Sequence, residues 1–118
     1  VAARPSGPPA AAPGKAVTDS KQAWTRRAES DRRRLDGEKG NRFAIQLELV
    51  CEIASLEEAW RYNRGRAMWL LPAVHGGRDC FRVFWGRYPT LEAARRAKAG
   101  IPSYFVTPRN HPAVVSVR

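Results

Sequence analysis

The chain has 118 residues, enough for one small folded domain and too few for two hydrophobic cores. Apolar residues make up 43% and charged residues 27%, as in an ordinary folded domain, but 21 Lys and Arg oppose 11 Asp and Glu. The formal net charge of +10 favours polyanionic partners such as nucleic acids or acidic envelope polymers. No apolar run approaches the ~20 residues that a membrane-spanning helix requires, so we expect no membrane span in this fragment.

The N-terminal third differs in composition from the rest. Residues 1–14 hold four of the nine prolines, which predicts a semi-extended linker. Residues 18–36 carry five arginines between Arg26 and Arg34 but few large apolar groups. This segment predicts a short, solvated helix that ends at Gly37 without packing on a core. Its arginines are either a patch for phosphates or another anionic surface, or simply the charged face of a linker.

The sequence from Arg42 onward has the alternation of a folded sheet. Residues 43–50, FAIQLELV, alternate strictly and predict a half-buried strand. Two later apolar segments are joined by a Gly-rich turn at residues 75–78, which predicts a hairpin. The tail after residue 107 either adds an edge segment or stays loose. The expected strands are residues 43–50, 67–74, 79–85 and 103–107.

Two helices are expected between these strands. Ser55 and Glu58 form a capping box, S-x-x-E, that opens the first helix, and Gly65 ends it. Thr90 caps the second helix, which ends at Gly100. The order β-α-β-β-α-β predicts an α+β fold of the ferredoxin-like or RNP-like type, with a four-stranded antiparallel sheet in the order 4-1-3-2. Both helices then cover one face of the sheet and leave the other open, where a polymer would lie.

Candidate binding residues are those whose side chains point to the open face. With the apolar positions of the first strand facing the helices, Gln46 and Glu48 face the open side. The Gln46 amide offers a donor and an acceptor suited to sugar hydroxyls and N-acetyl groups. Trp69 is undecided because its neighbours are apolar on both faces, and Tyr104 joins the open face if Phe105 points inward.

The third strand supplies the strongest candidates. Inward packing of Phe81, Val83 and Trp85 leaves Arg82 beside Phe84 on the open face. There the ring would cover the apolar face of a sugar while the guanidinium donates hydrogen bonds in a fixed fork. The opposite register, with Phe84 buried and Trp85 exposed, remains an alternative.

Two motifs carry a resemblance to a known family. Residues 43–47, FAIQL, are an aromatic residue followed by x-hydrophobic-Gln-hydrophobic, and residues 81–90 are FRVFWGRYPT, followed by Glu-Ala-Ala. Together they resemble the two signatures of the SPOR domain (sporulation-related repeat), a bacterial envelope module that binds peptidoglycan. The chain is then a Pro- and Arg-rich linker over residues 1–41 and a SPOR-like domain with a C-terminal tail over residues 42–118. Leu47-Glu48-Leu49 departs from the Gly-Ser-Phe-like residues of many members.

The resemblance implies a non-catalytic module that binds the glycan backbone of peptidoglycan, preferring strands that lack stem peptides. Such a module recruits a larger host protein to the division site or to zones of wall remodelling. It implies the bacterial periplasm, with a signal or anchor upstream, a monomeric domain, and no cofactor or metal. The expected glycan contacts are Gln46, Glu48, Arg82, Phe84, Trp69 and Tyr104.

The alternative is an RNA-binding domain of the RRM-like fold, which shares the βαββαβ plan. The third strand lacks the glycines of the RNP1 pattern, and Gln46 stands where an aromatic residue would be needed, so nucleic acid is the less favoured partner. An enzyme is the least favoured class, because no nucleophile–base pair, paired carboxylates or phosphate loop can be assembled from these residues.

Cys51 and Cys80 are too few for a disulfide framework and wrongly spaced for a zinc site. In the 4-1-3-2 order they end the first strand and begin its antiparallel neighbour, which permits the Cα separation that a disulfide requires. Strict alternation places them on opposite faces, and a β-bulge would remove that conflict. The sequence leaves open a Cys51–Cys80 disulfide or two buried thiols.

Overall fold

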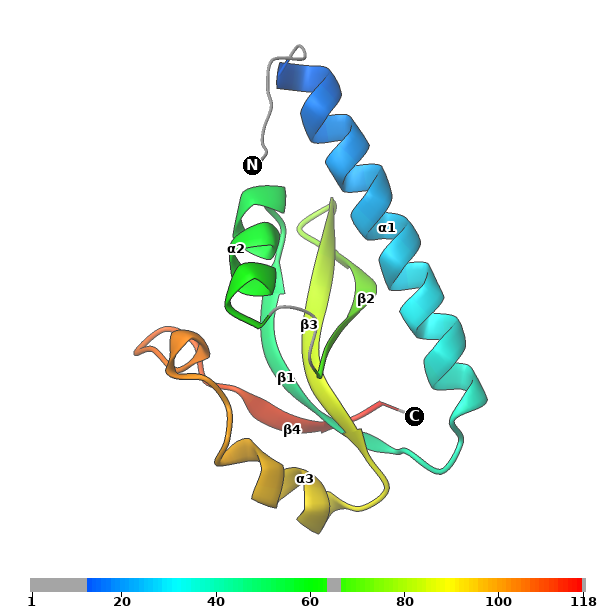
Figure 1. Cartoon of the computed structure of the whole chain (residues 1–118), viewed down its shortest axis with the longest axis vertical. Coiled ribbons are helices and arrows are strands. Elements are labelled where there is room, and N and C mark those ends of the chain that lie inside the picture. Colours follow the sequence, from blue (N-terminus) through cyan, green and yellow to red (C-terminus); the bar gives the residue numbers. More distant parts are fainter. Residues whose placement is uncertain (1–12, 64–66, 118) are drawn as a thin grey trace.

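The computed structural model describes residues 13–63 and 67–117. Over this part of the chain the protein is α+β, with three α-helices, one short 3₁₀ helix and a four-stranded antiparallel sheet (Figure 1). The expected linker over residues 1–14 lies largely outside the described residues. The elements are α1 (Pro13–Gly37), β1 (Phe43–Val50), α2 (Ile53–Asn63), β2 (Met68–His75), β3 (Arg78–Tyr88), α3 (Leu91–Lys98), η1 (Ser103–Phe105) and β4 (Ala113–Ser116).

The strand order of the sheet is β2-β3-β1-β4, which is the expected 4-1-3-2 order read from the other edge. The fourth strand, however, is not residues 103–107. That segment forms η1, and the edge strand comes from the tail, where Ala113–Ser116 pairs with β1. Phe105 is fully buried, and Asn110 holds the loop by donating from Nδ2 to the carbonyl oxygens of Leu47 and Phe105 at 2.8 and 2.6 Å.

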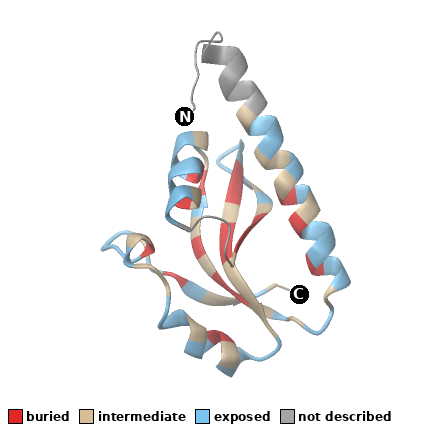
Figure 2. Cartoon of the chain, viewed as in Figure 1, coloured by how far each residue is buried: buried red, intermediate tan, exposed pale blue. Residues whose placement is uncertain are grey.

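Helices α2 and α3 lie over the same face of the sheet and close the main core. Leu56 and Ala59 of α2 and Ala97 of α3 pack with Ile45 and Val83 of the two central strands. Figure 2 shows the buried residues concentrated on these strands and on the facing sides of the helices. Leu56, Ala59, Ile45 and Val83 are fully buried, so this face is closed to ligands.

The two helix starts differ in how well the sequence predicted them. Thr90 caps α3 as expected, because its hydroxyl oxygen accepts a hydrogen bond from the amide of Ala93 at 3.1 Å. The prediction that a capping box at Ser55 opens the other helix is wrong. Helix α2 begins at Ile53, and Ser55 lies exposed inside its first turn. The carbonyl of Glu52 accepts from the amide of Leu56 at 3.2 Å, so the first turn closes ahead of the predicted cap.

Helix α1 is not the short solvated helix that the sequence predicts. It runs from Pro13 to Gly37 beside β2, the free edge of the sheet (Figure 1). Ala28, Asp31 and Leu35 are buried, and with Trp24 they form a narrow stripe along one side of the helix. The sequence does not reveal this stripe, because one of its members is a carboxylate and another is only an alanine.

Two irregularities in the pairing of β1 with β3 decide where side chains point. Gln46 pairs with Phe84 and Glu48 with Val83, so β1 carries one extra residue at Leu47. This β-bulge moves every later side chain of β1 to the face opposite the one that strict alternation predicts. The second irregularity lies on β3 at Gly86, whose φ of 66° is left-handed, and a Cβ there would collide with the ring of Tyr88.

Candidate ligand-binding face

The face of the sheet away from α2 and α3 carries a layered arrangement of two rings and two guanidinium groups. Trp69 on β2 and Phe84 on β3 are cross-strand partners, and their rings stack with centroids 4.5 Å apart. The guanidinium of Arg82 lies 5.3 Å from the Phe84 ring, and that of Arg87 lies 5.4 Å from the Trp69 ring. Stacked rings with cations over them form a rigid base for polar groups.

Arg82 and Gln46 are joined directly on this face. Arg82 donates from Nε and Nη2 to the Gln46 Oε1 atom, at 3.1 and 2.7 Å. The bonds fix both side chains, while the amide nitrogen of Gln46 and the Nη1 group of Arg82 keep donors that can serve a ligand. Leu49 and Leu71 are the cross-strand partners of Arg82 on either side. We call the surface formed by Gln46, Leu49, Leu71 and Arg82 the Gln46–Arg82 surface.

The aromatic ring expected beside Arg82 on the open face, Phe84, is not exposed, and neither is Trp69, whose orientation the sequence left undecided. Phe84 points away from α2 and α3, as the preferred register predicts, yet it is 0% exposed, and Trp69 is 2% exposed. Leu35 of α1 belongs to the same buried cluster as both rings, and three partly buried side chains pack against that cluster. Those three are Leu71, Val115 and Val117. The rings therefore support Arg82 and Gln46 from below, and a ligand on this face would meet the polar groups instead.

Glu48 and Tyr104 do not lie on this face, which corrects two of the expected contacts. The bulge at Leu47 turns Glu48 toward α2, where burial, followed by the nearby charge of Glu58, raises the pKa of its carboxyl group. Tyr104 stacks on Tyr62 at 4.3 Å and donates from its hydroxyl to Glu58 Oε1 at 2.7 Å. Burial and then the Glu58 carboxylate raise the pKa of Tyr104.

Arg87 lies on the same face of the sheet as Arg82, although it is not among the expected binding residues. The bulge at Gly86 directs it over Trp69, and its Nε donates to Glu38 Oε1 at 2.8 Å. Partial burial alone would raise the pKa of Glu38, but the hydrogen bond from Asn41 and the charge of Arg87 outweigh it and lower that pKa. In the sequence, the only sign of this placement of Arg87 is Gly86, a glycine between aromatic residues, which is typical of a β-bulge.

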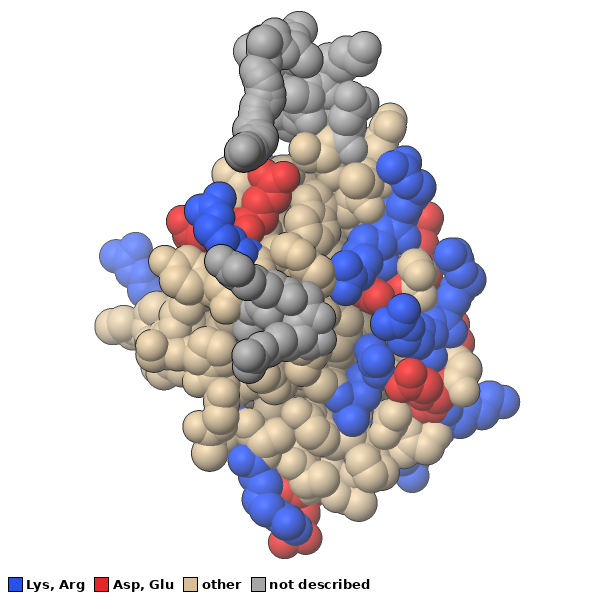
Figure 3. Space-filling model, viewed as in Figure 1, with Lys and Arg blue, Asp and Glu red and all other residues tan. Residues whose placement is uncertain are grey.

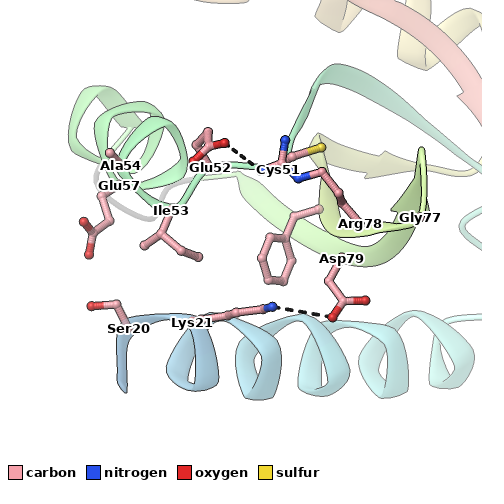
Figure 4. A pocket seen from close by; sticks show the side chains of 11 residues that line it. Ser20, Lys21, Cys51, Glu52, Ile53, Ala54, Glu57, Gly77, Arg78 and Asp79 are labelled. Atoms are coloured by element: carbon pink, nitrogen blue, oxygen red, sulfur yellow. Dashed lines mark hydrogen bonds and ion pairs between the residues drawn. The ribbon is translucent and has the colours of Figure 1, made fainter. Parts of the chain in front are cut away.

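Cys51 and Cys80 are joined in a disulfide that links the end of β1 to the start of β3. The bulge at Leu47 places Cys51 and Cys80 on one face, so the parity conflict disappears. Beside them lies a cleft of about 730 Å³ between α1, the start of α2 and the β2–β3 turn (Figure 4).

The charges in this cleft are largely paired with one another. Arg78 Nη2 lies 2.6 Å from Glu52 Oε1, and Lys21 Nζ lies 3.5 Å from Asp79 Oδ2. Figure 4 shows the first pair linking the start of α2 to β3 and the second linking α1 to β3. Both pairs join exposed side chains, so they hold the charged groups of the cleft in place only weakly.

Over residues 13–63 and 67–117, no three His, Cys, Asp or Glu side chains come close enough together to hold a metal ion. None of the helices described in this range combines the length and the apolar character needed to cross a membrane. The face of the sheet away from α2 and α3 carries an amide and two guanidinium groups over a buried aromatic pair. Comparison of the chain with protein-family models, with curated proteins and with solved structures finds no match in any of the three.

Proposed function

We propose that this domain binds the glycan strands of peptidoglycan on the Gln46–Arg82 surface, with a preference for strands that lack stem peptides. It acts without catalysis and targets a larger host protein to the bacterial cell wall or division site, in the periplasm. The proposal rests on the resemblance of FAIQL and FRVFWGRYPT to the SPOR signatures. Both motifs fall on the two central strands, β1 and β3, which pair with each other.

One observation carries the proposal furthest: Arg82 and Gln46, one from each motif, are hydrogen-bonded to each other on the same face. An amide and a guanidinium together present several donors to the hydroxyl and N-acetyl oxygens of a sugar chain. Leu49, which is 39% exposed, adds an apolar group suited to the C–H face of a sugar ring. A polar fork beside an apolar contact suits a glycan strand, and the carboxylates that remain on it once the stem peptides are removed would add to its attraction to Arg82.

The fold that we propose is the ferredoxin-like βαββαβ plan of this family, preceded by α1. The element order after α1 is β1, α2, β2, β3, α3, η1 and β4, and the sheet order suits that plan. In that plan residues 113–116 supply the fourth strand, and α1 is an extra helix that precedes the first strand.

The RNA-binding alternative is less well supported by the geometry of this face. Single-stranded RNA is held mainly by bases that stack on exposed aromatic rings. Here Trp69 and Phe84, the rings that would serve, are buried under Leu35 and its neighbours. A hydrogen-bonding surface for sugars keeps its function with the rings covered, whereas a stacking surface for bases does not.

Co-sedimentation with purified peptidoglycan sacculi, before and after an amidase has removed the stem peptides, tests the proposal. We expect the domain to sediment with sacculi and to do so more after amidase treatment. Arg82→Ala should weaken binding to sacculi by about tenfold, through the loss of a charged donor, and Gln46→Ala should weaken it by about the same factor because it removes a donor and also releases Arg82 from its fixed position. Arg95→Ala, which removes an exposed arginine from α3, is the matched control and should bind like the parent.

Phe84→Ala is unsuitable as a binding variant because it empties a fully buried position and costs about 3–5 kcal/mol of stability. Retention by single-stranded RNA at physiological salt that equals or exceeds retention by sacculi would overturn the glycan proposal. Normal binding by folded Gln46→Ala and Arg82→Ala would move the site away from this face.

A further inference from the structure

A second polar cavity, of about 300 Å³, lies between α1 and the ends of β2 and β3. Three arginines line it: Arg27 and Arg34, two helical turns apart on α1, and Arg87 on β3. One acid, Glu38, also lines it, and Gly86 and Trp69 contribute to its wall. The glycan proposal makes no use of this cavity, which lies farther along β3 than Arg82.

Two of these guanidinium groups are held in position by contacts of the fold. Arg27 donates from Nε to Asp31 Oδ2 at 3.3 Å and lies 4.3 Å from the Trp60 ring. Arg87 makes the corresponding pair of contacts, with the Glu38 carboxylate and the Trp69 ring. Each ion pair uses Nε, and the Nη groups of both arginines make no hydrogen bond to another described residue. These groups are therefore preorganised donors, so a ligand gains their bonds without ordering them first.

Arg34 supplies the positive charge that the two ion pairs leave unbalanced. Asp31 and Glu38 offset Arg27 and Arg87, whereas Arg34 is exposed and forms no ion pair among the described residues. Lys and Arg side chains also gather along the surrounding part of α1 (Figure 3), where Arg26 and Arg33 are exposed. The cavity therefore lies in a positive field that attracts anions.

We propose that this cavity is a binding site for the phosphate group of a soluble phosphoester. Forked arginine donors match the oxygens of phosphate, and three of them converge on a space large enough for a phosphate and part of the group that carries it. A lipid bilayer fits less well. The exposed large apolar residues of the described chain are Leu49, Tyr62, Val74, Leu91 and Val106, and none of them lines the cavity, so nothing there would enter a membrane.

The test is a titration of the whole chain with inorganic phosphate and with glycerol phosphate at constant ionic strength, followed by the NMR signal of the Trp69 indole N–H. This group donates to the Gly86 carbonyl oxygen at 2.8 Å in the wall of the cavity, so it reports binding directly. We expect a saturable shift of this signal with both phosphates. Arg34→Gln should weaken binding by about tenfold, and Arg95→Gln, a matched exposed arginine on α3, should leave it unchanged.

A shift that does not saturate, or equal binding by Arg34→Gln and the parent chain, would overturn the proposal. Equal binding of acetate and phosphate would reduce the site to general charge attraction and would also refute it. Vesicles of phosphatidylglycerol that shift the Trp69 signal when glycerol phosphate does not would refute the assignment to a soluble ligand. Sedimentation with sacculi is measured separately, so failure of this site leaves the glycan proposal standing.

Discussion

The carboxylate of Asp31 accepts a hydrogen bond from the backbone amide of Leu70 at 3.0 Å, although 39 residues separate them. Leu70 lies on β2, an edge strand of the sheet. An unpaired backbone amide on an edge strand can form a hydrogen bond with a strand of another chain. Asp31 is 1% exposed and also accepts from Arg27, so one buried acid both covers the edge strand and fixes an arginine of the phosphate cavity.

Removing this acid should destabilise the fold. Asp31→Ala leaves the Leu70 amide and the Arg27 guanidinium without their partner, and we expect a loss of about 2–4 kcal/mol in the free energy of unfolding. Urea denaturation followed by circular dichroism measures it. Asp36→Ala removes an exposed acid from the same helix and should change stability by less than about 0.5 kcal/mol. Equal stability of the two variants would show that α1 does not hold the edge of the sheet.

Leu35 is expected to anchor α1 to the sheet. Leu35→Ala should cost about 2–5 kcal/mol because this side chain, 4% exposed, covers the Trp69–Phe84 pair. Leu49→Ala makes the same chemical change at a position that is 39% exposed, and it should cost about 1 kcal/mol or less. Similar unfolding midpoints for the two variants would mean that α1 does not contribute to the stability of the fold, as expected for the solvated helix that the composition of residues 18–36 predicts.

The Cys51–Cys80 disulfide should contribute substantially to stability. It closes a loop with a sequence separation of 29, for which the chain-entropy relation gives about 3–4 kcal/mol. Reduction should lower the urea midpoint of the parent chain and leave that of a Cys51→Ser, Cys80→Ser double variant unchanged. When the protein is treated with an alkylating agent without reductant, mass spectrometry should find neither cysteine alkylated, because both sulfur atoms are held in the disulfide. Two alkylated cysteines in the folded protein would contradict the pairing.

Glu48 should make stability depend on pH. Its pKa in the folded chain is raised from the ordinary 4.5, so the stability it contributes is complete below that value and is lost as the pH rises through its folded-state pKa. The parent chain should therefore lose stability relative to Glu48→Gln as the pH rises from the ordinary pKa of 4.5 through the raised pKa of the folded chain. Glu57→Gln, which removes an exposed acid from the same region, should follow the parent at every pH. Parallel curves for Glu48→Gln and the parent would refute this placement of Glu48.

The sequence by itself determined most of the regular structure around the sheet. Strict alternation in FAIQLELV located β1, the Gly-rich turn located the β2–β3 hairpin, and Thr90 marked the start of α3. These signals are local, because each depends on residues within one turn or one strand. The strand order followed from the order of the elements, since few topologies join them without crossing.

Only the tertiary structure decided which side chains lie on the face of the sheet away from α2 and α3. One extra residue at Leu47 turned Glu48 toward α2 and brought Cys51 beside Cys80, and alternation in a single strand cannot reveal an insertion in its pairing. The cover over Phe84 comes from Leu35, 49 positions earlier in a segment whose composition indicates a linker. Its burial depends on the free edge of β2 and on the Asp31 carboxylate that fits it, and both exist only once the sheet has formed.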